Sequence, residues 1–292
     1  MHERVSISPA PLDGLSVTEQ LALLHRIGAR QAGFFAQLFE GPGGAAAEAA
    51  VAGSGIGVAY LVHYTGPPPD WPDSRELLER AVAVAGRLGA PLVYFPTGPA
   101  AAHRFGDAAD NLARRLRPVL PLARAAGVEL AIENTHALRS DISFAFSYRD
   151  VVRVARTAGL AAVLDLFGAW IEPDLAATVA GSLDILRVVQ VSDFVFGTAG
   201  PPNRWVPGDG DIPLGPVLAD LLAAGYQGVF DIEVFGPAIE AQGAEQALAR
   251  AGAWLTRMLG ELGSPGESGE SGESGESGES GEPGAGRAAS PA

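Results

Sequence analysis

The stretch ELAIENTHALRSDISFAFSYRDVVRVARTAGLAAVLDL, residues 129–166, shows how the chain is built. It begins with a short apolar run, Glu129–Ile132, and ends with another, Ala162–Leu166, and each is typical of a buried strand. Between them, Tyr148–Ala158 has a helical pattern and is followed by Gly159, a residue common at helix C-termini. A strand, a helix and a second strand in this order indicate an α/β fold with a parallel sheet.

The same alternation continues through the first 263 residues and predicts one closed (β/α)8 barrel. Strand-like runs lie at Arg4–Ile7, Ala32–Phe35, Gly57–Val62, Leu92–Phe95, Glu129–Ile132, Ala162–Leu166, Val188–Val191 and Val229–Val234. Helical patterns lie after the capping box Ser16-Val-Thr-Glu19 and at Ser74–Leu88, Asp107–Ala126, Tyr148–Ala158, Pro213–Ala223 and Ala244–Leu259. A doubly wound open sheet is the alternative, but it usually has a Gly-rich loop between its first strand and a helix. The Gly53–Gly57 cluster is followed by a strand, so it indicates a turn.

The last residues, 264–292, form a separate segment. Ser-Gly-Glu repeats with Pro and Ala fill it, and it has no large apolar residue. A chain of this composition cannot bury enough surface to offset the entropy lost on ordering. We therefore predict a barrel domain at 1–263 and a disordered acidic tail at 264–292.

The amino-acid composition excludes several classes of catalytic site and disfavours some partners. The chain has no cysteine and no lysine, which excludes thiolate nucleophiles, Cys-based zinc sites, Schiff-base catalysis and P-loops. Its net charge of −14 disfavours a nucleic-acid partner, because nucleic-acid affinity depends on neutralising phosphates. No apolar run approaches the roughly 20 residues of a membrane span, and the N-terminus has no signal-peptide pattern. We expect a cytoplasmic protein whose partner is a small molecule, with a homo-oligomer left open.

Polar side chains end the last four predicted strands. Glu133, Asp165, Gln190 and Glu233 each follow an apolar run. Catalytic residues of a barrel lie at the C-terminal ends of its strands, so we expect these four to converge. Three carboxylates and an amide would repel one another in a buried site, and a divalent cation removes that cost. Their oxygen atoms suit Mg²⁺ or Mn²⁺ better than a soft-ligand metal.

The order of these four residues resembles the sugar-phosphate isomerase/epimerase family, whose barrel is similar to that of xylose isomerase. Residues 203–212, Asn-Arg-Trp-Val-Pro-Gly-Asp-Gly-Asp-Ile, are similar to the Arg-x-x-Pro-Gly-x-Gly-Glu-Ile loop of hydroxypyruvate isomerases, which also have Gln at the position of Gln190. The family usually has His three residues after the Asp of the sixth strand, whereas this chain has Gly168. That departure puts a sugar-phosphate substrate in doubt.

The resemblance implies a metal-dependent isomerase or epimerase that moves a proton beside a carbonyl through an enediolate. It implies that Glu133 and Glu233 exchange the proton while binding the metal, and that Asp165 and Gln190 are ligands only. We expect Arg204 to bind a substrate oxyanion, since guanidinium suits carboxylate or phosphate. His63 and His136 are further candidates for substrate contact, although either fits equally well as a structural residue. A lyase that dehydrates a keto-sugar or keto-cyclitol and a metal-free binding protein remain alternatives.

Overall fold

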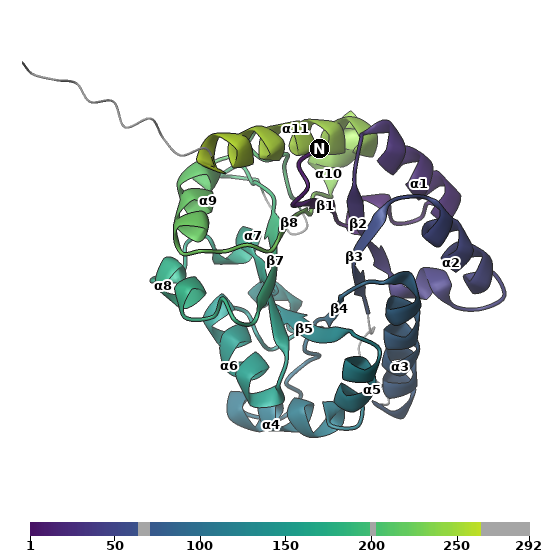
Figure 1. The fold of residues 1–292 in the computed structure, drawn as a ribbon. Helices are drawn as coiled ribbons and strands as arrows, with labels where there is room; N and C mark the ends of the chain where they lie inside the picture. The colour runs from purple at the N-terminus through teal and green to yellow at the C-terminus, as the bar shows by residue number, and fades with distance from the viewer. Residues whose placement is uncertain (64–70, 199–202, 264–292) are drawn as a thin grey trace, which may run out of the picture.

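The computed structural model of the protein describes residues 1–63, 71–198 and 203–263, and these form a closed barrel (Figure 1). Its strands follow in chain order from β1 to β8, each parallel to its neighbours, and β8 pairs with β1 to close the ring. The predicted (β/α)8 barrel is therefore confirmed and the open-sheet alternative is wrong. The tail predicted at 264–292 lies outside the described residues.

The eight strands lie where the apolar runs predicted them, to within two residues at each end. Their bounds are β1 Val5–Ile7, β2 Gln31–Phe35, β3 Gly57–Val62, β4 Leu92–Phe95, β5 Glu129–Glu133, β6 Ala161–Asp165, β7 Leu186–Val191 and β8 Val229–Ile232. In a parallel barrel both faces of a strand are covered, so strands are recognised as near-continuous apolar runs.

Helices surround the barrel on the outside (Figure 1). Their bounds are α1 Val17–Arg26, α2 Gly44–Gly53, α3 Trp71–Leu88, α4 Phe105–Leu116, α5 Leu120–Ala125, α6 Tyr148–Ala158, α7 Leu166–Ala169, α8 Leu175–Ala180, α9 Leu214–Ala223, α10 Pro237–Gln242 and α11 Ala244–Gly263, with short 3₁₀ turns at η1 Ala10–Leu12, η2 Ala36–Phe39 and η3 Ala137–Arg139. None of the helices in the described part of the chain combines the length and the apolar composition that a membrane span requires.

The helices differ from the sequence prediction in several places, and the short helices α7, α8 and α10 were not predicted. The helix expected over Asp107–Ala126 is two helices, α4 and α5, separated near Pro118. A proline lacks the N–H that a helix interior requires, so the break has a local cause. The Ala-rich helix α2 was missed because it has almost no contrast between polar and apolar faces. The capping box is confirmed, since Ser16 accepts from the Glu19 N–H and Glu19 accepts from the Ser16 N–H.

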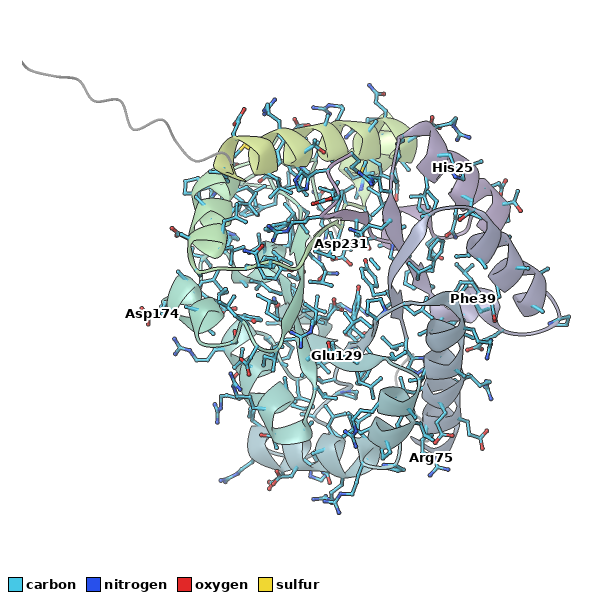
Figure 2. All side chains as sticks on the ribbon, viewed as in Figure 1. His25, Phe39, Arg75, Glu129, Asp174 and Asp231 are labelled. Carbon is cyan, nitrogen blue, oxygen red and sulfur yellow. The ribbon has the colours of Figure 1, made fainter. Side chains whose placement is uncertain are left out.

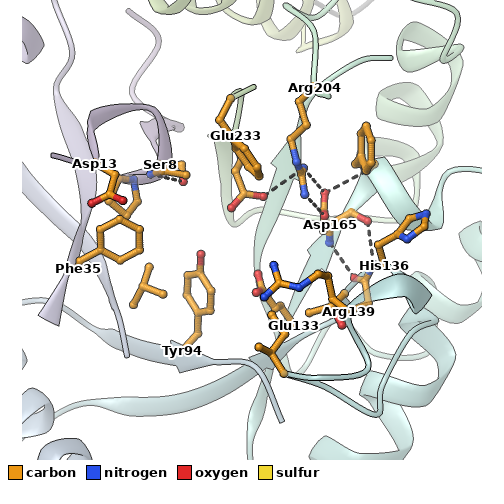
Figure 3. Close-up of a pocket in the computed structure, with 18 of the residues that line it drawn as sticks. Ser8, Asp13, Phe35, Tyr94, Glu133, His136, Arg139, Asp165, Arg204 and Glu233 are labelled. Carbon is orange, nitrogen blue, oxygen red and sulfur yellow. Dashed lines mark hydrogen bonds and ion pairs between the residues drawn. The ribbon is translucent and has the colours of Figure 1, made fainter. Parts of the chain in front are cut away.

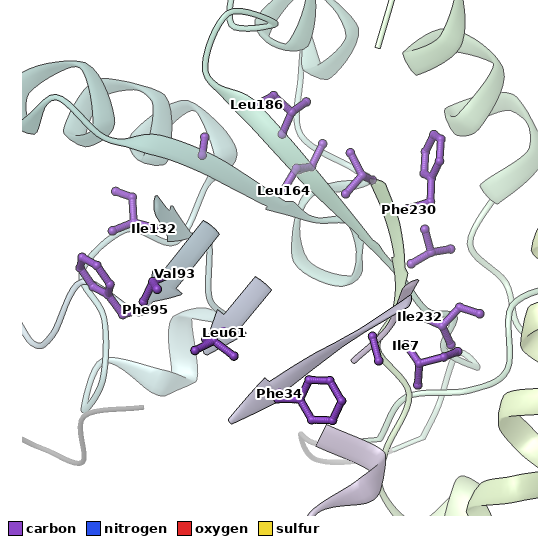
Figure 4. Close-up of a cluster of buried hydrophobic side chains, with 14 of the residues drawn as sticks. Ile7, Phe34, Leu61, Val93, Phe95, Ile132, Leu164, Leu186, Phe230 and Ile232 are labelled. Carbon is purple, nitrogen blue, oxygen red and sulfur yellow. The ribbon is translucent and has the colours of Figure 1, made fainter. Parts of the chain in front are cut away.

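Side chains alternate between the two faces of each strand, and this alternation positions the site. Outward-facing residues such as Leu61, Ile132 and Leu164 pack beneath the helices (Figure 4). The inward-facing residues form a second cluster that includes Tyr60, Tyr94, Ala131, Val163 and Val188. Because the side-chain period of a strand is two, the residue two positions further along faces inward as well. Glu133, Asp165 and Gln190 are those residues.

Candidate functional site at the barrel mouth

A pocket of about 760 Å³ opens at the C-terminal ends of the strands (Figure 3). Its described lining includes Glu133, Asp165 and Glu233, so three of the four predicted metal ligands share one cavity. The fourth, Gln190, is fully buried at the end of β7, where it pairs in register with Asp165 on one side and with Asp231 on the other. The strand ends therefore bring the predicted residues together.

Arg204 lies inside this group of acids (Figure 3). Its Nη2 donates to Asp165 Oδ2 at 2.7 Å, and its Nη1 donates to Asp165 Oδ1 at 3.0 Å and to Ser192 Oγ at 3.0 Å. Nη1 also lies 3.1 Å from Glu233 Oε2. A two-point pair of this kind is the strong arrangement for an arginine and a carboxylate. Arg204 is thus the positive charge of the cluster, and its role in binding substrate stays a prediction.

Aromatic rings hold the guanidinium in place. Its Cζ lies 4.5 Å from the centre of the Phe167 ring and 5.0 Å from that of Phe235. The Arg204 backbone N–H also donates to the Phe235 carbonyl at 3.1 Å. Stacking on aromatic faces favours arginine over other cations. Only 9% of Arg204 is exposed, so it is a fixed part of the pocket wall.

The loop that carries Arg204 is organised by Asp193. The Asp193 carboxylate is buried and accepts four backbone N–H groups, from Phe194 and Ile212 at Oδ1 and from Gly208 and Gly210 at Oδ2, all at 2.9 to 3.1 Å. A Cβ at Gly210 would lie 2.4 Å from Asp193 Oδ1, so only glycine allows this approach. The structure thus gives a physical reason for the Pro-Gly-x-Gly pattern. Asp193 was missed as a site-building residue.

Burial and mutual repulsion act on both glutamates. The pKa of Glu133 is raised well above its usual range, by burial first and then by the charges of Glu233 and Asp165. Burial likewise raises the pKa of Glu233 to about 8, although Arg204 opposes the shift. Carboxyl groups whose pKa is raised in this way suit general acid and base chemistry.

Gln190 is held by Tyr94, a residue that the sequence did not single out. Gln190 Nε2 donates to the Tyr94 hydroxyl at 3.1 Å, and a hydrogen bond from the same side chain lowers the pKa of Glu133. Gln190 Oε1 is buried and has no hydrogen-bond partner among the described residues. Tyr94 packs with the inward-facing apolar residues of the barrel and also lines the pocket. A tyrosine inside an apolar strand gives little sequence signal for such a role.

A divalent metal fits this site in its donor chemistry. Three carboxylates and a buried amide oxygen without a partner are hard donors, as Mg²⁺ and Mn²⁺ prefer. In the arrangement described, however, no three His, Asp or Glu side chains among the described residues form a group that could hold an ion. Arg204 lies between Asp165 and Glu233 instead. Metal binding by Glu133, Asp165, Gln190 and Glu233 therefore stays a prediction.

The two predicted histidines occupy different places. His136 lines the pocket, is exposed, and its Nδ1 accepts from the Leu138 N–H at 3.2 Å, which caps the turn η3. His63 is buried directly after β3 and is not among the residues described as lining the pocket. Of the two, His136 is the one placed to reach a bound molecule.

Asp165 is positioned by Asn134, the residue directly after β5. The side chain of Asn134 donates to the Asp165 carbonyl at 2.9 Å and accepts from the Asp165 N–H at 2.8 Å. Asp165 Oδ1 in turn accepts from the Phe167 N–H at 3.0 Å, which caps the short helix α7. Asn134 therefore fixes the backbone from which the carboxylate projects.

Asp231, a further buried acid on β8, lies deeper in the barrel than Glu233. Asp231 precedes Glu233 by two residues, and Figure 2 shows it inside the ring of strands, while Arg75 lies on the outer helix α3 and Asp174 directly before α8. The Tyr60 hydroxyl donates to Asp231 Oδ2 at 2.7 Å. Burial raises the pKa of Asp231 to about 7. The alternation that places Glu233 inward also predicts an inward Asp231, but no such role was assigned from the sequence.

This raised pKa predicts a pH-dependent stability. Between the usual value of 3.8 and about 7, the folded protein holds a proton on Asp231 that the unfolded chain releases, so stability falls as pH rises through this range. Asp231→Asn removes the titration and keeps an oxygen for Tyr60. With a chelator present, we expect the free energy of unfolding of the variant to exceed that of the wild type by roughly 4 kcal/mol at most at pH 8. This difference should shrink toward pH 4. Urea unfolding at both pH values checks this, and a variant less stable at both would contradict it.

Comparison with known proteins identifies the family. A family model described as a xylose isomerase-like TIM barrel matches residues 25–258. This chain belongs to that family. Among curated proteins, no match was found.

Solved structures share the xylose isomerase-like fold. A protein from Sinorhizobium meliloti 1021 is 23% identical, with a TM-score of 0.73 over 89% of this chain and 98% of that one. The IolI protein, solved with a binding zinc atom, is 16% identical, with a TM-score of 0.72 over 89% and 99%. D-psicose 3-epimerase from Clostridium cellulolyticum H10, solved with D-tagatose, is 17% identical, with a TM-score of 0.67 over 87% and 98%. At these identities the likeness shows the fold.

This xylose isomerase-like barrel departs from the expected pattern at Gly168, and the structure does not require glycine there. A Cβ built on Gly168 would have one described atom within 4 Å outside its own chain neighbours, Asn134 Nδ2 at 3.5 Å. Its φ is not positive either. Neither packing nor backbone conformation therefore explains the absence of a larger side chain at Gly168.

Proposed function

We propose that this protein is an isomerase or epimerase of a small keto-sugar or hydroxy-carbonyl compound. The reaction is a proton transfer at the carbon beside the carbonyl, through an enediolate. The observation that carries this proposal is the placement of Glu133, the last residue of β5, and Glu233, the residue directly after β8, around one pocket at the barrel mouth. A substrate between them meets one carboxyl group that removes a proton and another that returns it.

The remaining pocket residues serve this step in distinct ways. Asp165 and Arg204 place a negative and a positive charge near the reacting carbonyl. His136 lies at the rim of the pocket, where it can contact substrate hydroxyls. When bound to Glu133, Asp165, Gln190 and Glu233, Mn²⁺ or Mg²⁺ would supply Lewis-acid stabilisation of the developing oxyanion. We further propose a small-molecule partner, which the pocket at the barrel mouth supports, and a cytoplasmic location.

The test is solvent-proton exchange. Wild-type protein with saturating Mn²⁺ is incubated in D₂O with a panel of keto-sugars, inososes and 2-hydroxy-aldehydes, and ¹H NMR follows the proton beside the carbonyl. We expect deuterium to enter at that carbon for at least one compound, with an isomer or epimer as product. Loss of a hydroxyl group from the product would instead identify a dehydratase, and no exchange with any compound would contradict proton-transfer chemistry.

A further inference from the structure

The carboxylate cluster already contains a cation of its own. Arg204 contacts both oxygens of Asp165, at 2.7 and 3.0 Å, and one oxygen of Glu233, at 3.1 Å. The side chains of Asp165 and Arg204 are 6% and 11% exposed, so water screens this pairing only weakly. In this arrangement, the guanidinium supplies the positive charge that the buried acids require.

A divalent ion requires the same oxygens. Mg²⁺ binds carboxylate oxygen at about 2.0 to 2.1 Å and holds a near-octahedral shell. Nη1 lies within about 3 Å of both Asp165 and Glu233, so an ion shared by these two acids would meet the guanidinium charge at close range. Like charges at such a separation repel, and the effect is stronger in a buried site.

Gln190 provides an independent observation. Its amide nitrogen faces Tyr94 and Glu133, while Oε1 is buried without a hydrogen-bond partner among the described residues. A buried acceptor left in this way is costly. In the metal-free arrangement, N–H donors thus bind the carboxylates of the site. The Gln190 amide oxygen, which would ligate a cation, has no hydrogen-bond partner among the described residues.

We propose that Arg204 and a divalent cation compete for Asp165 and Glu233. The ion then binds only as the guanidinium releases one or both carboxylates. The released N–H groups face the pocket and become available to a substrate oxyanion, so metal binding precedes and enables anion binding. This inference deepens the proposed function and rests on it for the reaction that the opened site performs.

The test measures the affinity for Mn²⁺ alone, without substrate, by isothermal titration of chelator-treated protein. Arg204→Met removes the charge but keeps an unbranched stem between Phe167 and Phe235. We expect the variant to bind Mn²⁺ at least tenfold more tightly than the wild type. Arg139→Met is the matched control, because Arg139 lines the same pocket but pairs with Asp141 at the surface. It should change the affinity by less than about threefold, since exposed charges are screened.

A second variant keeps the test decisive if Arg204→Met does not fold. Phe235→Leu removes one aromatic face from the guanidinium and leaves its charge, so it should also tighten Mn²⁺ binding, by a smaller factor of about three. Circular dichroism establishes that each variant is folded. Unchanged or weaker binding by a folded Arg204→Met, or by Phe235→Leu where the former is unfolded, overturns the competition.

The remaining outcomes separate this inference from the proposed function. If neither the wild type nor the variants bind Mn²⁺, the competition is wrong. If Arg204→Met binds more tightly but the wild type with saturating Mn²⁺ exchanges no substrate proton, the competition stands and the isomerase proposal fails. The two claims therefore have different readouts, an affinity ratio and a proton-exchange rate.

Discussion

Replacing Glu133 or Glu233 by Gln is expected to lower the rate of proton exchange by roughly 10²- to 10⁴-fold, the usual contribution of a general acid or base. The amide keeps an oxygen and nearly the same shape, so packing and some metal binding survive, while proton transfer is lost. The chain contains no Lys and no Cys that could replace these carboxyl groups. Exchange rates at saturating substrate and Mn²⁺ check the prediction.

Glu172→Gln is the matched control for this loss. Burial also raises the pKa of Glu172, and its carboxylate accepts from the Tyr148 N–H, but it is not among the residues described as lining the pocket. Its variant should keep exchange within about threefold. If Glu133→Gln and Glu233→Gln both turn over at near-normal rates at saturating metal, the two-carboxylate mechanism is wrong and His136 or His63 becomes the next candidate.

The second large effect concerns the loop that carries Arg204. Asp193→Ala removes the acceptor of four backbone N–H groups, from residues 194, 208, 210 and 212. A fully buried donor left without a partner, as the Ile212 N–H would be, costs about 1 to 3 kcal/mol. The other three donors are partly buried, so water and relaxation of the loop recover part of their loss. We expect the free energy of unfolding to fall by about 3 to 5 kcal/mol and proton exchange to fall with it, because Arg204 loses its fixed position.

Asp209→Ala provides the comparison within the same loop. Asp209 forms an exposed ion pair with Arg250 at 2.7 Å, and such pairs contribute about 1 kcal/mol or less. Urea unfolding and proton exchange should therefore separate the two variants clearly. An Asp193→Ala protein that unfolds at the wild-type urea concentration would show that the loop does not depend on this carboxylate.

Much of the fold could be predicted because a barrel repeats one simple pattern. The eight apolar runs gave every strand, and Gly159 ends α6 in the left-handed conformation that a Gly at a helix C-terminus indicates. The position of Glu133, Asp165 and Glu233 at the pocket also followed, because parallel strands end at one edge. Period and strand direction are local properties of the sequence.

The rest of the site depends on contacts between residues far apart in the chain. Nothing near Arg204 in the sequence indicates that it pairs with Asp165, 39 residues away, or that Phe235 stacks on it. Asp193 binds N–H groups up to 19 residues further on, and Tyr94 meets Gln190 across 96 residues. Such partners are set by how the strands close into a ring, which residue types alone do not reveal.

The most direct test of the account is a crystal structure of the Glu233→Gln protein with Mn²⁺ and a substrate found by the exchange assay. We predict that the carbon beside the carbonyl lies between Glu133 and residue 233, with both side chains within about 3 to 3.5 Å of the reacting atoms, on opposite faces. A substrate bound at the pocket rim, or with both side chains on one face or out of reach, would contradict proton transfer by the two glutamates.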